Sequence, residues 1–317
     1  MLFRFYVSAT YILSEETRVT AALRYTDETK RYSVRFLSAP DTVLLLADGR
    51  PAARTIRTRF TDLSPRLVLD RRIGGALLYA SVAKGFRSGS FDGRARNIEF
   101  ALTRQDVIAP ETVWSWEAGA KADLLRGRLR VNVAYFLNNY TDIAFSAARA
   151  NSTPPEIFRQ NVGDARLHGL EVEWTATPLA GVDLGGWIST LSDRFTRLRS
   201  VIGCTGVVER DLDLRFTPAF RYQVRAGLTP PVGAARVRVG GDYGDASSYN
   251  IALCNEPQHR VSDAGALKLQ LGVEVGDWGA TLSATNLTDN RYNSGSVSTV
   301  GYPVAPREIV LRVRRRI

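Results

Sequence analysis

Long stretches of strict alternation between apolar and polar residues constrain the fold of this chain more than any other feature. From residue 267 to residue 275, every odd position is Leu or Val, whereas the even positions are Lys, Gln, Gly and Glu. The same period of two runs through residues 114–124, 129–137 and 220–228. Because successive side chains of a β-strand point to opposite faces, each stretch predicts a strand with one apolar and one polar face.

The connections between the expected strands distinguish a membrane barrel from a soluble sandwich, which shows the same alternation. Short and long connections alternate, as in outer-membrane barrels with short periplasmic turns and long extracellular loops. The stretches also reach the ~9–11 residues that a tilted strand needs to cross a bilayer. The sequence therefore predicts an all-β protein, an antiparallel transmembrane β-barrel with about thirteen strands in this chain. The short turns are expected at residues 14–17, 71–75, 125–128, 178–181, 230–234 and 276–277, and the long loops at about 27–58, 85–111, 145–162, 198–212, 246–261 and 288–307.

Composition excludes several classes of function. The net charge is +10, but the basic residues are scattered and form no compact block with interleaved aromatics, so no nucleic-acid partner is expected. A scattered basic surface suits outer-membrane lipid and lipopolysaccharide equally well. No run of ~18 apolar residues predicts a transmembrane helix. No nucleotide loop, nucleophile motif or metal-ligand spacing occurs, so we expect neither an enzyme nor a cofactor.

Several motifs, taken in their order and spacing, resemble the C-terminal barrel part of a TonB-dependent outer-membrane receptor. They are LLYASVAKGFRSGSFDGR at residues 77–94, the segment 110–143, NVGDARLHGLEVEWTATP at residues 161–178, NLTDNRY at residues 286–292 and the ending PREIVLRVRRRI. The resemblance implies a single unit at residues 1–317 that supplies about 13 of an expected 22 strands. It also implies a place in the Gram-negative outer membrane. The family's plug domain and first strands are expected to lie outside this sequence.

The resemblance implies a receptor that takes up a scarce ligand, above all a ferric siderophore, with a cobalamin or a glycan as alternatives. A TonB complex would energise import through the plug domain. Arginine and tyrosine suit an anionic, catecholate or aromatic iron chelate through charge, hydrogen bonding and stacking, although loop tyrosines are also common for structural reasons. The ligand-contact candidates in the outer loops are Arg87, Phe91, Arg94, Tyr249, Tyr292 and Tyr302.

The polar faces of the expected strands carry a mixed set of charges that would line the lumen. These charges are either a solvated, plug-facing scaffold or direct ligand contacts. His168 shares the parity of Leu170 and Trp174, so we expect it on the lipid side, away from Glu171 and Glu173 and from any joint metal site. The lumen-facing charges are Glu117, Lys121, Glu171, Glu173, Arg221, Arg225, Arg236 and Arg238.

The cysteines and the aromatic residues have structural interpretations. Cys204 and Cys254 fall in neighbouring long loops on the extracellular side, where a disulfide is permitted and separate thiols are the alternative. Two cysteines are too few for a usual zinc site. Aromatic residues near strand ends or on apolar faces are expected to form interfacial girdles. They are Tyr6, Tyr79, Trp114, Trp116, Tyr135, Trp174, Trp187 and Trp278.

Three other functions remain open at this point. The chain could form a passive porin-like or structural barrel, it could be a non-functional truncated receptor fragment, or it could be a soluble β-rich binding module. An odd number of strands leaves unpaired edges at about residues 2–11 and 308–317, unless a hairpin inside residues 27–58 restores an even number. Open edges are not tolerated in lipid, so we expect the chain alone to aggregate or to close into a smaller barrel.

Overall fold

The computed structural model of the 317-residue chain describes residues 1–39, 42–46, 49–93, 107–148, 157–199, 212–252, 257–297 and 300–316. Its main sheet contains thirteen long strands that follow the alternation in the sequence. They are β1 (Leu2–Ile12), β2 (Thr17–Arg35), β5 (Ala53–Ile73), β6 (Ala76–Arg87), β9 (Glu111–Leu124), β10 (Leu129–Ala148), β11 (Ile157–Leu179), β12 (Val182–Leu198), β13 (Phe220–Leu228), β15 (Ala235–Ala246), β18 (Ala266–Val275), β19 (Trp278–Thr285) and β22 (Glu308–Arg315).

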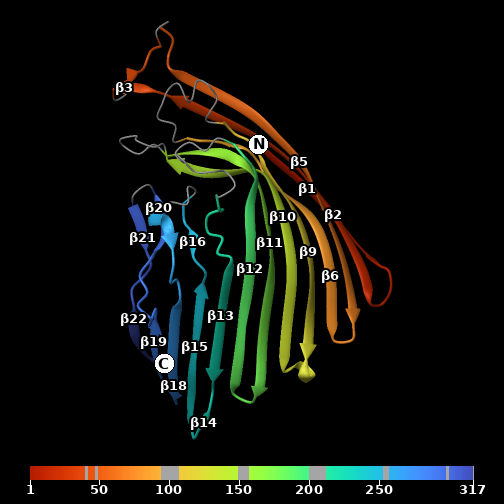
Figure 1. Ribbon diagram of the computed structural model, residues 1–317, viewed down its shortest axis with the longest axis vertical. Coiled ribbons are helices and arrows are strands. Elements are labelled where there is room, and N and C mark those ends of the chain that lie inside the picture. Colours follow the sequence, from red (N-terminus) through yellow and green to blue (C-terminus); the bar gives the residue numbers. More distant parts are fainter. Residues whose placement is uncertain are drawn as a thin grey trace.

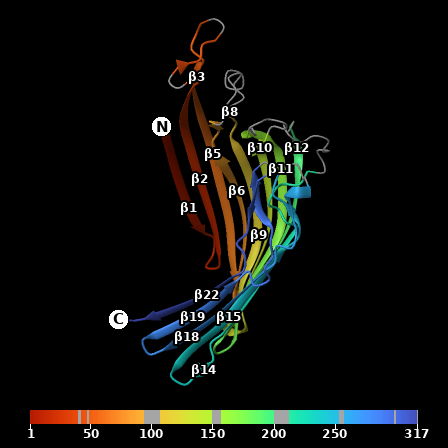
Figure 2. The same cartoon turned by 90° about the vertical axis from the view of Figure 1, so that its left-hand side faces the viewer.

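The thirteen strands form one antiparallel sheet in the order in which they occur in the sequence. The short strand β14 (Pro231–Val232) pairs with β15 in addition. Figure 1 shows the strands side by side, with the short strands β3 (Leu37–Ala39), β16 (Tyr249–Asn250), β20 (Asn293–Val297) and β21 (Val300–Pro303) of the long connections towards one end of the sheet. Figure 2 shows that the sheet is curved, with β1 and β22 at its two ends turned to the same side. The predicted all-β, antiparallel barrel wall is therefore confirmed, and the described part of the wall is open.

Strands β2 and β5 are longer than the sequence predicts. The loop expected at about residues 27–58 is shorter, because β2 and β5 stay in register as far as the pair Arg35 and Ala53. The alternation is hidden there because polar residues such as Thr29 and Lys30 occupy both faces. A hairpin does occur in this loop, between β3 (Leu37–Ala39) and β4 (Thr42–Val43), but it forms a separate sheet and adds no strand to the wall.

The short turns lie where the sequence predicts them. Residues 13–16 join β1 to β2, residues 74–75 join β5 to β6, and residues 276–277 join β18 to β19. Gly74 and Gly276 have φ angles of 57° and 54°. Tight turns between strands need this left-handed conformation, which glycine adopts without steric cost. Following the convention for outer-membrane barrels, we call the end of the sheet with the short turns the periplasmic end and the end with the long connections the extracellular end.

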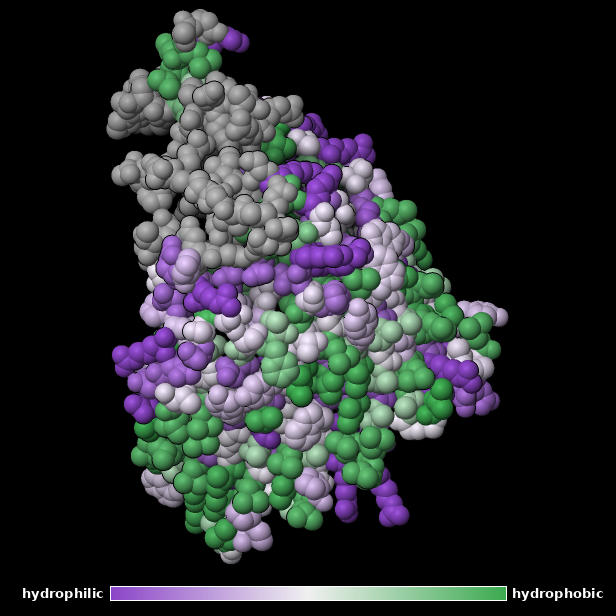
Figure 3. Space-filling model, in the orientation of Figure 1, coloured by the Kyte–Doolittle hydropathy of each residue, from purple (hydrophilic) through white to green (hydrophobic). Residues whose placement is uncertain are grey.

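The register sorts the side chains onto two faces. Leu69 and Leu170 belong to the apolar face and are 47% and 41% exposed, as lipid-facing side chains are in the absence of lipid. In Figure 3 the convex side of the sheet carries hydrophobic side chains over its lower part, below a hydrophilic band. One row of the apolar face holds Leu69, Ala80, Ala118, Tyr135, Leu170 and Thr190, and the next row, on the polar face, holds Asp70, Tyr79, Gly119, Ala134, Glu171 and Ser189.

Five of the eight aromatic residues predicted for the girdles lie on the apolar face, and three lie on the polar face, where a girdle cannot form. Trp114, Trp116, Tyr135, Trp174 and Trp278 lie on the apolar face. Near the periplasmic end, the Arg315 guanidinium lies 5.5 Å from the centre of the Trp278 ring. The three exceptions on the polar face are Tyr6, Tyr79 and Trp187. Residue type suggested an interface for these three, but the parity along the strand decides the face.

His168 lies on the apolar face, as the sequence predicts. It stands directly opposite Leu137, and its Nδ1 atom is 3.4 Å from the hydroxyl oxygen of Tyr135. Glu171 and Glu173 are on the other face. Among the described residues, no group of His, Cys, Asp and Glu side chains is arranged to hold a metal ion. None of the helices in the described ranges is long and apolar enough to cross a membrane.

Two arginine substitutions at neighbouring positions test which face meets lipid. We expect Leu170→Arg to destabilise the protein in phospholipid vesicles by ~2–4 kcal/mol, because it places a charge in the hydrocarbon. We expect Glu171→Arg, on the polar face, to change the free energy of unfolding by less than ~0.5 kcal/mol. Urea titrations followed by tryptophan fluorescence measure both values. Equal effects of the two substitutions would contradict this assignment of the faces.

Candidate functional site

A pocket of about 310 Å³ lies at the extracellular ends of β13 and β15. Segments far apart in the sequence build it, including β12, β16 (Tyr249–Asn250) and the residue before β20 (Asn293–Val297). Ligand sites typically have volumes of ~300–1,000 Å³. We call it the mouth pocket, and its lining residues are Trp187, Phe216, Pro218, Arg221, Tyr222, Gln223, Gly244, Asp245, Ala246, Tyr249, Ala264 and Tyr292.

A guanidinium group and an indole ring form one wall of the mouth pocket. The Arg221 guanidinium lies 5.6 Å from the centre of the Trp187 ring, in a cation–π contact. The Trp187 indole donates a hydrogen bond to Gln223 at 2.9 Å, and the Gln223 amide donates to Asp242 at 2.8 Å. These bonds hold the ring in place. Arg221 forms no ion pair with any carboxylate in the described part of the chain, so its donors are free for an anion.

Tyr249 and Tyr292 add phenol groups to the same pocket. Burial raises the pKa of Tyr249, the neighbouring Tyr292 raises it further, and Arg221 offsets part of this effect. Tyr249 is therefore a neutral phenol at physiological pH and can donate a hydrogen bond. A guanidinium, an indole face and a phenol donor together suit an anionic ligand that has oxygen acceptors and a flat ring.

The segment before β13 is fixed by hydrogen bonds to two neighbouring elements. The Leu214 backbone N–H donates to Asp193 on β12 at 2.7 Å. The Phe216 backbone N–H donates to the carbonyl oxygen of Asn250 on β16 at 2.8 Å. Phe216, which lines the mouth pocket, is therefore positioned by both elements. A small hydrophobic core at this end of the sheet comprises Ile143, Val162, Ala165 and Leu214.

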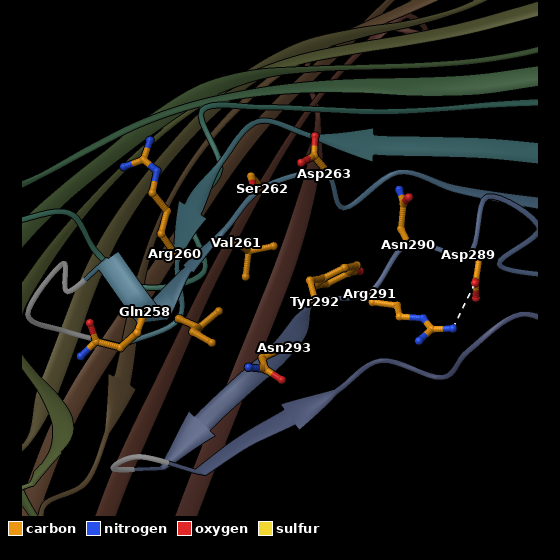
Figure 4. Close-up of a pocket in the computed structure, with 11 residues that line it drawn as sticks. Gln258, Arg260, Val261, Ser262, Asp263, Asp289, Asn290, Arg291, Tyr292 and Asn293 are labelled. Carbon is orange, nitrogen blue, oxygen red and sulfur yellow. Dashed lines mark hydrogen bonds and ion pairs between the residues drawn. The ribbon is translucent and has the colours of Figure 1, made fainter.

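A second pocket, of about 520 Å³, shares Tyr292 with the mouth pocket. Figure 4 shows its lining side chains, which come from Ile251, from residues 258 and 260–263, and from residues 289–293. Asp289 and Arg291 form an ion pair of 3.2 Å at its border. Most of the other lining groups are polar, so this pocket is a wet extension beside the aromatic wall.

The Asn286 side chain holds the connection that carries Tyr292. Its amide donates to the carbonyl oxygens of Asn290 and Ala305, at 3.0 Å each, and its oxygen accepts the Asn290 backbone N–H at 3.1 Å. The Asn290 and Thr288 side chains both donate to the carbonyl oxygen of Gly265. The NLTDNRY motif is therefore a structural turn that fixes one wall of both pockets.

Three of the predicted loop residues do not line the mouth pocket. Arg87 is 3.2 Å from the Glu111 carboxylate, which also binds Arg159 at 3.0 Å. Phe91 stacks on Tyr32, with ring centres 5.2 Å apart, so its ring packs against the wall. The third, Tyr302, is 53% exposed on β21 (Val300–Pro303). Arg94 and the two cysteines, Cys204 and Cys254, lie outside the described residues, so their predictions stay open.

All eight charges predicted to line the lumen stand on the polar face of the sheet. Among them, only Arg221 lines the mouth pocket. Glu117 accepts a hydrogen bond from the Tyr79 hydroxyl at 2.7 Å, and the Lys121 ammonium lies 5.7 Å from the centre of the same ring. These contacts are of the scaffold kind, and ligand contact by any of the eight stays a prediction. They are Glu117, Lys121, Glu171, Glu173, Arg221, Arg225, Arg236 and Arg238.

Trp187 and Phe216 belong to the mouth pocket although the sequence did not nominate them as ligand contacts. The sequence could have placed Trp187 on the polar face, because its position on β12 has the parity of Asp183 and Ser189 and not that of the apolar residues. Phe216 follows a long connection without periodicity, and no local pattern marks it. Its place depends on hydrogen bonds to segments that lie more than twenty residues away.

Comparisons with known proteins agree with this architecture. The sequence matches the family described as "TonB dependent receptor-like, beta-barrel" over residues 3–288. It is 25% identical over 215 residues to the ferric-pyoverdine 358 receptor of Pseudomonas putida. The aligned region is 65% of this chain and 24% of that protein. The chain thus spans about a quarter of the length of this curated relative.

Three solved structures share the fold. The ferric yersiniabactin uptake receptor FyuA from Yersinia pestis has a TM-score of 0.75 at 14% identity, covering 99% of this chain and 45% of that chain. The siderophore receptor PiuA from Acinetobacter baumannii has a TM-score of 0.73 at 15% identity, covering 98% and 42%. The copper transporter OprC has a TM-score of 0.70 at 14% identity, covering 99% and 47%.

The Asp289 carboxylate gives a test of how the Tyr292 connection is held. The Arg307 backbone N–H, followed by the Arg291 and Arg307 guanidinium groups, lowers the pKa of Asp289. A lowered pKa stabilises the fold above the ordinary carboxylate value of about 4, and this effect is lost as the pH falls through the lowered value. We therefore expect hydrogen exchange in residues 286–307, corrected for intrinsic rates, to stay constant between about pH 5 and 8.

Two substitutions complete this test. We expect Asp289→Asn to speed exchange in residues 286–307 at every pH in that range, because it removes the charge that binds both arginines. Asp263→Asn, in the same wet pocket but without an ion pair in the described residues, is the matched control and should leave exchange unchanged. A rise in the wild-type exchange rate between pH 8 and pH 5 would contradict the lowered pKa.

Proposed function

Because the chain belongs to the TonB-dependent receptor-like β-barrel family, we propose that residues 1–317 are the C-terminal portion of the barrel of an uptake receptor. Its location is the Gram-negative outer membrane. The ligand that we propose is a ferric siderophore, which binds in the mouth pocket. Energy for import would come from a TonB complex that acts through a plug domain outside residues 1–317.

The convergence of Arg221, Trp187, Tyr249 and Tyr292 in one pocket carries this proposal. Ferric siderophores are oxygen-rich chelates, and many carry negative charge or aromatic rings. The guanidinium would pair with charge, the indole face would stack on a ring, and the phenols would donate hydrogen bonds. The relatives named above for ferric pyoverdine and ferric yersiniabactin support the choice of ligand. The proposed process is non-covalent binding and passage, so it needs neither an enzymatic step nor a cofactor.

Tryptophan fluorescence of the full-length receptor that contains residues 1–317, purified in detergent, tests the proposal, with ferric pyoverdine and ferric yersiniabactin as probes. We expect saturable quenching by at least one probe, because the ligand would lie beside Trp187. Arg221→Gln should weaken binding by roughly 10- to 100-fold, since hydrogen bonds to charged groups contribute ~1.5–3 kcal/mol. Trp187→Phe should remove most of the quenching signal.

Arg238→Gln is the matched control for Arg221→Gln. It removes the same charge from the same polar face, but from a position nearer the periplasmic end and outside the mouth pocket. We expect it to change affinity by less than about 2-fold, because charges beyond a Debye length are screened. Equal weakening by both substitutions would mean unspecific attraction and would sink the proposed site.

Two other outcomes would replace the proposed ligand or function. Binding of Cu²⁺ but of neither ferric complex would point to a metal ion, as for the copper transporter with this fold. Fast, unselective passage of solutes through the reconstituted receptor, without binding of any probe, would favour the passive porin-like barrel.

A further inference from the structure

Arg215, in the connection between β12 and β13, carries a partly buried positive charge that no carboxylate neutralises. Its guanidinium carbon is 4.9 Å from the centre of the Phe145 ring and 5.9 Å from the centre of the Phe216 ring. With the residues that the structure describes, Arg215 forms neither an ion pair nor a hydrogen bond. A charge that is removed from water without a partner is costly, so a site of this kind attracts an anion.

The charges around Arg215 increase this demand for an anion. Burial lowers the pKa of Arg215, and the positive charge of Arg159 lowers it further. The Glu111 carboxylate is shared by Arg87 at 3.2 Å and Arg159 at 3.0 Å. The Asp92 carboxylate accepts the Arg159 backbone N–H. Neither carboxylate forms an ion pair with Arg215, which stays charged at physiological pH because arginine does not lose its proton in proteins.

Two further hydrogen-bond donors close to the Phe145 ring lack an acceptor. Gln160 stands directly opposite Phe145 in the register of β10 and β11, and its Nε2 atom is buried without a hydrogen-bond partner. Arg159 donates through Nη2 to the carbonyl oxygen of Ala144 at 3.2 Å, whereas its Nε atom is buried without a partner. Most buried donors in proteins have an acceptor. Three donor groups around residues 144 and 145 therefore share the same deficit.

We propose that a small inorganic oxyanion of the sulfate and phosphate class binds to Arg215 and Gln160, with Arg159 as a further donor. Stacking against Phe145 holds the plane of the guanidinium group and leaves the N–H groups at its edge free. Two of these N–H groups match two oxygen atoms of one oxyanion. A small ion is favoured over the proposed siderophore because the Gln160 and Arg159 donors are buried.

The bound anion would tie the connection before β13 to β10 and β11. The backbone N–H groups of Leu214 and Phe216 already bond to Asp193 and to the Asn250 carbonyl oxygen. Because Phe216 lines the mouth pocket, the anion would help to hold one wall of that pocket. The inference does not depend on the proposed siderophore, since it uses only the unsatisfied charge and donors around Phe145.

Hydrogen exchange of the full-length receptor that contains residues 1–317, purified in detergent, tests the inference. The probe is sodium sulfate, with sodium chloride added to keep the ionic strength constant. We expect exchange of the Leu214 and Phe216 amides to slow by roughly 10-fold when sulfate is about ten times above its Kd, because local opening must release the ion. Exchange in β18 and β19, far from Arg215 in the sheet order, should not change.

Three variants locate the effect. Arg215→Gln should abolish the slowing by sulfate at both amides. Gln160→Leu removes one donor and should raise the sulfate concentration that gives half of the effect by roughly 2- to 10-fold. Arg238→Gln removes the same charge as Arg215→Gln from β15, near the periplasmic end. It is the matched control and should leave the response to sulfate unchanged.

Two outcomes would overturn the inference. An absence of slowing at the Leu214 and Phe216 amides of the wild-type receptor would mean that no oxyanion binds there. Slowing of equal size in β18 and β19, or in Arg215→Gln, would mean that sulfate stabilises the whole fold through its exclusion from the protein surface. The comparison between segments uses the unaltered receptor, so it decides the question even if a variant fails to fold.

Discussion

Backbone hydrogen bonding in the absence of water is the constraint on which the rest of this structure depends. In the hydrocarbon layer, each N–H and C=O group must find its partner on a neighbouring strand. β2 and β5 satisfy this over nineteen consecutive residue pairs without a shift. Because the register decides the face on which each side chain stands, a shift by one residue would exchange the lipid side and the lumen side. The chemistry of the wall therefore follows from its hydrogen bonds.

The same residue type has different surroundings on the two faces. Arg221 on the polar face lies over an aromatic ring at the mouth, where a soluble ligand can reach it. Arg194 on the outer face stands opposite a second arginine at the level of an interfacial tryptophan. A count of charges along the sequence treats both as part of a scattered basic surface. Only the parity within each strand tells on which of the two faces each arginine stands.

The parts of the fold that could be predicted are local. Alternation with a period of two and turns such as the one at Gly74 are properties of adjacent residues, so faces and turns were readable from the sequence. The extension of β2 and β5 was hidden because Arg31 and Arg57 place charge where other strands carry apolar residues. Tyr292 was predicted as a ligand contact, which stays a prediction. Its place beside Tyr249 in the mouth pocket depends on the turn at Asn286, which joins distant segments.

Within the described part of the chain, β1 and β22 each pair with only one long strand. This limits how another strand can join the edge at β1. On the outer face, Phe3, Phe5 and Val7 stand at alternate positions, so the incoming strand must present apolar residues at the same spacing. A displacement by one residue would turn those apolar residues towards water, whereas a displacement by two residues, about 7 Å, would keep them in lipid. An incoming strand can therefore pair with β1 in the wrong register only in steps of two residues, because a shift by one residue would put its apolar side chains on the wrong face.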